Sequence, residues 1–202
     1  MPYTDKTMRI QIGLLAASLL LQACSSAPTL DTAERDKYNP DTTARVRLYG
    51  NNGGSIRLYP GKDCNTATKA DVVSGSGSHL ESFKSMLGDH QVKSIGMPDS
   101  AHSKNLGYGE TITEKVIPAS VPLTVVMHFG SPNSYCFPPP ATFTPQPGRN
   151  YEAFLHIENK RCYLKIDVIG IDGTVTPQPY DVCSKDLLKE LNKPDPYTGP
   201  KI

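Results

Sequence analysis

The sequence predicts a mainly β protein: a small β-sandwich or partly open barrel with one or two short helices. Short segments in which apolar and polar residues alternate recur along the chain, separated by clusters of Gly, Pro, Asn and Asp. Proline reaches 18 of 202 residues, about twice the average share, whereas Gly and Pro together stay below the ~25–30% of low-complexity chains. A chain of this length has room for one such domain with tails.

Seven segments carry the strand pattern. In the first, Arg45 and Arg47 face away from the apolar side, and in the sixth Glu152, His156 and Glu158 do so. The expected strands are 45–49, 56–58, 91–96, 111–117, 123–129, 151–157 and 161–171.

Two short helices are also expected. The first begins at the capping-box pattern Ser78–Glu81 and ends at Gly88. The second begins after Ser184 and ends before Pro194, and its apolar residues at helical spacing are Leu187, Leu188 and Leu191. Neither segment contains a chemical motif.

Residues 1–23 have the pattern of a secretory signal peptide. A basic start precedes the apolar run 10–21, and small residues follow it. The run is shorter than the ~20 residues that a bilayer-spanning helix needs. Met8 opens an equally complete signal, so translation starts at either Met1 or Met8.

The segment Leu21-Gln22-Ala23-Cys24 resembles the lipobox of bacterial lipoproteins. The resemblance implies that diacylglycerol is transferred to the Cys24 thiol, that the chain is cleaved before Cys24, and that the new amino group is acylated, as by palmitate. Two or more acyl chains hold a protein stably at a membrane. Ser25 stands where an Asp retains lipoproteins at the inner membrane of enteric-type bacteria, so the resemblance implies the periplasmic face of the outer membrane.

The remaining chain divides into three parts. Residues 24–43 contain one large aliphatic residue, Leu30, and cannot bury enough apolar area to offset their ordering entropy. We therefore expect a lipidated N-terminus and flexible tether there, a β-rich globular domain over 44–193, and a C-terminal tail over 194–202.

The four cysteines beyond Cys24 are expected to form disulfides, because export places them in an oxidising compartment. Asp172-Gly173 predicts a two-residue type I′ hairpin turn, and counting outward from its flanks places Cys162 opposite Cys183. We therefore predict the disulfides Cys162–Cys183 and, by elimination, Cys64–Cys136.

Charge and motifs exclude several classes of function. A net charge of +1 supplies no field for holding nucleic acid. The sequence contains no Cys-x-x-Cys, Gly-x-Ser-x-Gly or Ser-x-x-Lys motif, and no pair of carboxylates stands out. No two histidines have the i,i+4 spacing of a helical zinc pair. We expect no metal and no cofactor.

The residues from 45 to 183 resemble a group of proteobacterial lipoproteins to which we can assign no activity. The resemblance implies a lipobox, a small disulfide-containing β-domain and cysteines at corresponding landmarks. These landmarks are Tyr59-Pro-Gly-Lys-Asp-Cys64, Ser94-Ile-Gly-Met-Pro98, Pro118-Ala119, Pro145-Gln-Pro-Gly-Arg-Asn-Tyr-Glu-Ala153, Cys162 and Cys183.

The sequence thus predicts a lipid-anchored cell-envelope protein whose non-enzymatic β-domain faces the periplasm and binds or scaffolds an envelope protein or glycan. Two alternatives stay open. One is an envelope hydrolase that combines His128 or His156 with nearby carboxylates, which a deep cleft with converging polar groups would favour. The other is a small inhibitor of a secreted hydrolase, which a rigid protruding loop near 135–140 would favour.

Overall fold

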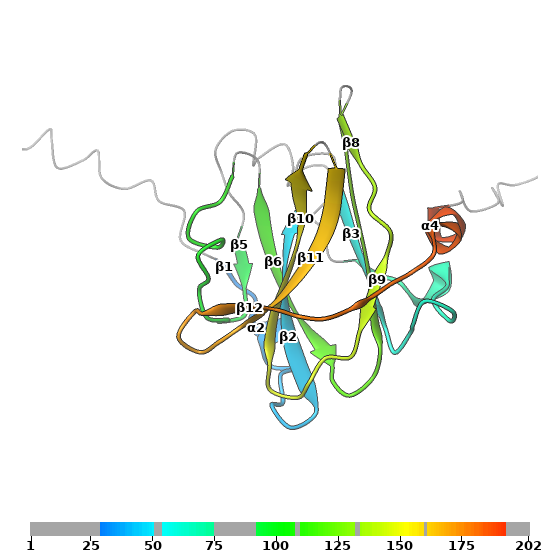
Figure 1. Cartoon of the computed structure of the whole chain (residues 1–202). Coiled ribbons are helices and arrows are strands. Elements are labelled where there is room, and N and C mark those ends of the chain that lie inside the picture. The colour runs from blue at the N-terminus through cyan, green and yellow to red at the C-terminus, as the bar shows by residue number, and fades with distance from the viewer. Residues whose placement is uncertain are drawn as a thin grey trace, which may run out of the picture.

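The computed structural model describes residues 29–50, 54–74, 92–107, 110–131, 134–159 and 161–192. In this part of the chain two β-sheets face each other as a sandwich and do not close into a barrel (Figure 1). The prediction of a mainly β fold with short helices is confirmed.

The two sheets differ in size. Sheet A has seven strands, in the spatial order β1 (Thr29–Leu30), β5 (Val92–Ser94), β6 (Thr111–Pro118), β2 (Thr43–Gly50), β10 (Asn150–Glu158), β11 (Arg161–Ile169) and β12 (Val175–Pro177). Sheet B has the order β13 (Asp181–Val182), β9 (Ala141–Phe143), β7 (Leu123–Ser131), β3 (Gly54–Pro60) and β4 (Val73–Ser74), and β8 (Ser134–Cys136) also pairs with β7. The helical segments in the described ranges are α2 (Thr32–Arg35), the 3₁₀ turn η2 (Lys69–Asp71) and α4 (Lys185–Asn192). Each of the seven expected segments contains a strand.

The hydrophobic core lies between the sheets, because alternate residues of the central strands point inward. Sheet A contributes Val46 and Leu48 from β2 and Tyr151 and Ala153 from β10, all buried. Sheet B contributes Ile56, Leu58, Val125 and Met127. Fully burying one large aliphatic side chain contributes ~1.5–3 kcal/mol, so this shared layer holds the sheets together.

The domain begins before the predicted boundary at residue 44. Thr29–Leu30 pairs in parallel with β5, and Asp31 caps α2 by accepting a hydrogen bond from the Glu34 backbone N–H at 3.0 Å. The buried Glu34 carboxylate accepts the backbone N–H of Val116 at the edge of β6, at 2.9 Å. Residues 29–43 are therefore not a flexible tether: polar contacts with the sheet hold this segment, although it buries little apolar surface.

The turn at Asp172-Gly173 lies where it was predicted but has a different geometry. Gly173 donates to the carbonyl of Gly170 at 3.0 Å, and Gly170 donates to the carbonyl of Thr174 at 2.8 Å. Gly173 has φ of 82°, whereas Asp172 has no positive φ, which a type I′ turn would require. The result is a three-residue loop with a left-handed glycine, and it shifts the β11–β12 register by one residue from the prediction.

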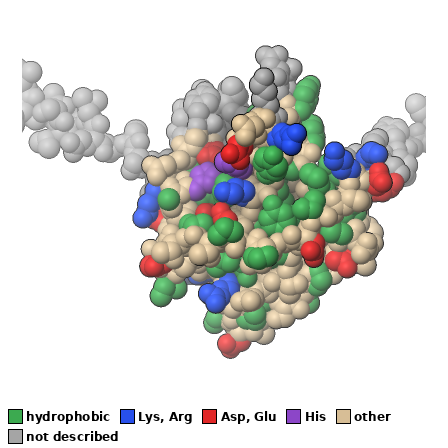
Figure 2. All heavy atoms as spheres, in the orientation of Figure 1, with side chains coloured by type: hydrophobic (Ala, Val, Ile, Leu, Met, Phe, Trp, Pro, Cys, Tyr) green, Lys and Arg blue, Asp and Glu red, His purple; other side chains and the backbone are tan. Residues whose placement is uncertain are grey.

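The returning strand β12 is also much shorter than expected. Its pairing with β11 covers only 175–177, after which the chain crosses from sheet A to β13 at the edge of sheet B (Figure 1). The backbone N–H of Gln178, between Pro177 and Pro179, still donates to the carbonyl of Ile166 at 2.9 Å, so the chain leaves β11 only after this contact. Tyr180, on the crossing segment, packs against the core. Figure 2 shows hydrophobic side chains gathered in the middle of this face.

The C-terminal helix α4 confirms the second helix prediction. The Ser184 hydroxyl oxygen accepts the backbone N–H of Leu187 at 3.3 Å, as expected of a capping residue. Leu191 is buried against Tyr59 and Val126 on the outer face of sheet B. The first predicted helix, at 78–88, lies outside the described residues, as does the tail over 194–202.

Candidate functional site

The structure pairs the four cysteines differently from the prediction. Cys64 bonds to Cys183 with a Cα–Cα distance of 5.2 Å, and Cys136 bonds to Cys162 with 5.6 Å. The predicted pairs Cys162–Cys183 and Cys64–Cys136 are therefore wrong, although all four cysteines are in disulfides. The physical reason is that the chain leaves sheet A after Pro177, which carries Cys183 to the other sheet.

The Cys136–Cys162 disulfide joins the two sheets. Cys136 ends β8 in sheet B, and Cys162 lies near the start of β11 in sheet A. The bond lies at the base of the β7–β8 hairpin, which extends beyond the body of the sandwich (Figure 1). It therefore fixes the direction in which this hairpin projects.

The β7–β8 hairpin carries exposed aromatic side chains. Tyr135 is 70% exposed and Phe137 is 47% exposed, and their rings stack with centroids 6.2 Å apart. Phe137 also stacks on His128 of β7, with centroids 5.4 Å apart. These three residues form a continuous aromatic surface, which we call the hairpin aromatics.

His128 is held in place by a cross-strand neighbour. It lies opposite Ser55 on β3, and the Ser55 hydroxyl is 3.0 Å from His128 Nδ1. Burial, together with the positive charge of Arg57, lowers the pKa of His128 below its usual value. A neutral imidazole is therefore favoured. No carboxylate hydrogen-bonds this ring within the described residues, so the pair lacks the orienting group of a hydrolytic triad.

The second predicted histidine is on the opposite side of the molecule. His156 points away from the core of sheet A, where its Nε2 lies 3.9 Å from the Glu158 carboxylate. On β7, His128 lies two residues after Val126, so it shares the outward-facing side of sheet B with Val126. The structure thus does not bring His128 and His156 together.

Sequence reasoning missed a row of four buried charged residues on the outer face of sheet A. Glu114 on β6, Arg47 on β2, Glu152 on β10 and Asp167 on β11 are successive partners in the strand register. All four are at most 7% exposed. The segment after β5 covers them, with Ile95 and Met97 buried among apolar neighbours on this face.

Arg47 and Glu114 form a buried ion pair. Arg47 Nε and Nη2 donate to Glu114 Oε1 at 2.9 and 2.6 Å. Glu114 Oε2 accepts the Ser94 hydroxyl and the backbone N–H groups of Ile95 and Met97. This one carboxylate therefore fastens the covering segment to the sheet.

Glu152 has a second set of donors. The hydroxyls of Tyr49 and Ser100 donate to Glu152 Oε2 at 2.8 and 2.7 Å. Burial, and then the hydrogen bond to Glu152, raise the pKa of Tyr49, whose ring stacks on His102 with centroids 4.1 Å apart. Within the described residues no hydrogen bond reaches the side-chain carboxylate of Asp167, which faces Glu152 from β11.

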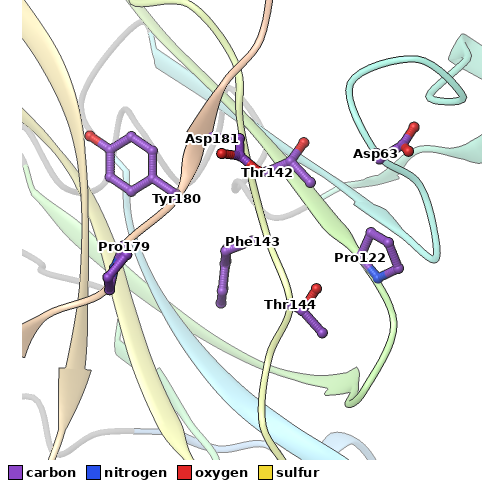
Figure 3. A pocket seen from close by; sticks show the side chains of 8 residues that line it. All are labelled: Asp63, Pro122, Thr142, Phe143, Thr144, Pro179, Tyr180 and Asp181. Atoms are coloured by element: carbon purple, nitrogen blue, oxygen red, sulfur yellow. The ribbon is translucent and has the colours of Figure 1, made fainter.

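A groove of about 400 Å³ lies on sheet B, beside the crossing segment (Figure 3). Its lining combines carboxylates, hydroxyls, prolines and aromatic rings. The residues are Asp63, Pro122, Thr142, Phe143, Thr144, Pro179, Tyr180 and Asp181.

Comparison with known proteins adds no relative. No family model, curated protein or solved structure matches this chain. The resemblance to lipoproteins therefore stays a prediction, and Cys24 with its lipobox lies outside the described residues.

The described part of the chain lacks two features, a bilayer-spanning helix and a metal-binding cluster. None of its helices is long and apolar enough to cross a bilayer. Its His, Cys, Asp and Glu side chains nowhere form a group of three or more that could hold a metal ion.

Proposed function

We propose that this protein is a lipid-anchored envelope protein that binds another envelope component through the hairpin aromatics and catalyses no reaction. The lipobox and the apolar run before it support anchoring at Cys24. The two cysteine pairs at disulfide distance fit an oxidising compartment such as the periplasm.

The observation that carries the binding proposal is the exposed Tyr135–Phe137 stack on a hairpin pinned by Cys136–Cys162. Aromatic side chains dominate the energetics of protein interfaces, and Tyr loses little conformational entropy on binding. A surface that is already rigid avoids part of the ordering cost of association. This hairpin therefore has both the contact chemistry and the preorganisation of a recognition element.

Site-specific crosslinking in intact cells tests this surface. A photoreactive amino acid at Tyr135 should yield a discrete crosslinked product with one envelope component. The matched control is Ile171, which is 95% exposed at the tip of another hairpin. The binding proposal fails if Tyr135 gives no product, or only the products that Ile171 gives.

Anchoring is tested separately with Cys24→Ser. This variant should leave the membrane fraction, because the acyl chains would have no attachment site. Continued partition with membranes would show that the lipobox does not anchor the chain.

The same hairpin favours a second candidate function, inhibition of a secreted hydrolase. It protrudes, and three consecutive prolines, Pro138–Pro140, restrict the chain that follows it. If the protein is an inhibitor, the purified protein should slow a hydrolase, and the Tyr135→Ala variant should not. A binder without inhibitory activity would form the crosslink but slow none of the hydrolases tested.

A further inference from the structure

The groove on sheet B is a candidate ligand site separate from the hairpin aromatics. Its floor is Thr142 of β9, which faces Asp181 of β13 on one side and Thr124 of β7 on the other. Figure 3 shows Thr142 between Asp181 and Asp63, with Pro122 and Pro179 on opposite sides. The volume of about 400 Å³ lies within the range typical of small-ligand sites.

The hydroxyl at the floor is engaged by neighbouring protein groups. The Thr124 hydroxyl donates to the carbonyl of Lys62 at 2.9 Å, which uses its only proton. Thr142 lies 2.6 Å from the Thr124 hydroxyl oxygen and must donate in that contact. Thr142 Oγ1 also lies 3.4 Å from Sγ of both Cys64 and Cys183, so the acceptors open to a ligand are the carboxylates of the groove and not this hydroxyl.

Asp63 adds an ionised acceptor. Its Oδ1 accepts the backbone N–H groups of Asn65 and Thr66 and the Thr66 hydroxyl. These hydrogen bonds lower the pKa of Asp63 below its usual value. No described residue donates to its other oxygen, Oδ2, which is free to accept from a ligand.

The groove contains no compensating cation. No Lys, Arg or His is among its lining residues, and within the described chain neither Asp63 nor Asp181 forms an ion pair. The Tyr180 hydroxyl is not a free donor, because it donates to the carbonyl of Leu164. Prolines and aromatic rings supply apolar walls between these acceptors.

We propose that this groove binds an aliphatic ammonium group, such as a lysine-like side chain or an amine-terminated chain. The ammonium supplies the donors and the positive charge that the acceptors lack, and its methylene stem contacts the prolines and Phe143. The proposal depends on neither lipid anchoring nor the hairpin aromatics.

The test is a nuclear magnetic resonance titration of the full chain in detergent micelles with cadaverine as the probe. Cadaverine should shift the backbone amide signals of Thr142, Thr144 and Tyr180 in a saturable manner. The uncharged diol of the same chain length is the ligand control and should leave these signals in place.

Two variants assign any binding to the groove. Asp63→Asn keeps an oxygen at Oδ1 for the local hydrogen bonds, and Asp181→Asn changes an exposed side chain. Each should weaken cadaverine binding up to about fivefold, because a solvent-exposed ion pair is worth ~0–1 kcal/mol. Asp186→Asn, on the exposed face of α4, should leave binding unchanged.

Three results would overturn the proposal. These are unshifted groove signals at saturating amine, equal shifts with the diol, and equal affinity in the Asp63→Asn/Asp181→Asn double variant. Because crosslinking from Tyr135 reports on another surface, failure here leaves the proposed function untouched.

Discussion

Glu152 on β10 and Asp167 on β11 lie directly opposite each other, and both side chains are buried. Two hydroxyls, from Tyr49 and Ser100, stabilise the Glu152 carboxylate. Asp167 has no such donor within the described residues and faces the charge of Glu152. Burial raises the pKa of Asp167 most, Glu152 raises it further, and Lys165 and His102 act against this. The two carboxyl groups therefore have unequal surroundings, and burial without a hydrogen-bond donor disfavours the charged form of Asp167.

Replacing Asp167 with Asn should stabilise the protein at neutral pH. A carboxyl whose pKa is raised in the folded state binds its proton more tightly there. Its contribution to the stability of the fold is therefore full at acidic pH and is lost as the pH rises through the folded pKa. Asp167→Asn removes this loss. We expect a gain of roughly 1 kcal/mol in the free energy of unfolding at neutral pH, the size of a typical point substitution, and a smaller gain in acid.

Denaturant titrations of both proteins across a pH series measure this difference. Asp172→Asn is the control of opposite sign, because hydrogen bonds from Thr174 lower the pKa of Asp172. The stability that Asp172 contributes is therefore present above its unfolded pKa and is lost as the pH falls through its folded pKa. A gain from Asp167→Asn that is the same at every pH would show that the pKa of Asp167 does not differ between the folded and unfolded states.

The buried Arg47–Glu114 pair should be costly to break on one side. Arg47→Leu leaves the Glu114 carboxylate buried without its counter-charge, and such changes cost ~3–5 kcal/mol. Arg35→Leu is the matched control, because Arg35 pairs with Asp36 at the surface, where a pair contributes ~0–1 kcal/mol.

Urea unfolding gives the free energies of both variants. Amide hydrogen exchange adds a local measurement, since Ile95 and Met97 donate to Glu114. These amides should exchange faster in Arg47→Leu than in the native protein. A loss below 1 kcal/mol would mean that the three donors from the covering segment suffice to hold the Glu114 charge.

The charged row also shows where sequence reasoning stops. Alternation correctly placed Arg47 and Glu152 on the side away from the core. It could not reveal that this side is covered, because the cover comes from residues 95–102, far along the chain. The local signal was present as apolar Ile95 and Met97 beside a short strand, next to Gly96 and Pro98. Which residues of other strands Ile95 and Met97 cover is determined by the three-dimensional fold and not by the local sequence.

Features set by neighbouring residues were predicted well. Ser184 and the leucine spacing located α4, and Asp172-Gly173 located a turn. The disulfide pairing failed because it depended on extending the register of that turn over many residues. A one-residue change in loop length and the early end of β12 were enough to send Cys183 to Cys64.

The two disulfides should stabilise the protein to different extents. Cys64–Cys183 spans 119 residues and Cys136–Cys162 spans 26. In the chain-entropy model the corresponding losses, on replacing each pair with serine, are about 4.9 and about 3.5 kcal/mol. Denaturant unfolding of the two double variants should therefore rank Cys64→Ser/Cys183→Ser as the less stable.

Peptide mapping without reduction is the direct check on the pairing. It should recover one peptide pair that contains Cys64 and Cys183 and another that contains Cys136 and Cys162. A peptide joining Cys162 to Cys183 would contradict the structure and restore the hairpin pairing predicted from the sequence.

Tyr135 offers a test that separates recognition from stability. Its side chain is 70% exposed, so Tyr135→Ala should change the free energy of unfolding by no more than about 0.5 kcal/mol. If the hairpin aromatics bind a partner, the same change removes a central aromatic contact, and such contacts cost ~2 kcal/mol or more when truncated. Crosslinking from a photoreactive residue at Phe137 should then fall sharply. Tyr163→Ala, a change at another exposed tyrosine, should leave the yield unchanged. An unaltered crosslinking yield in Tyr135→Ala would mean that the exposed Tyr135 ring takes no part in binding.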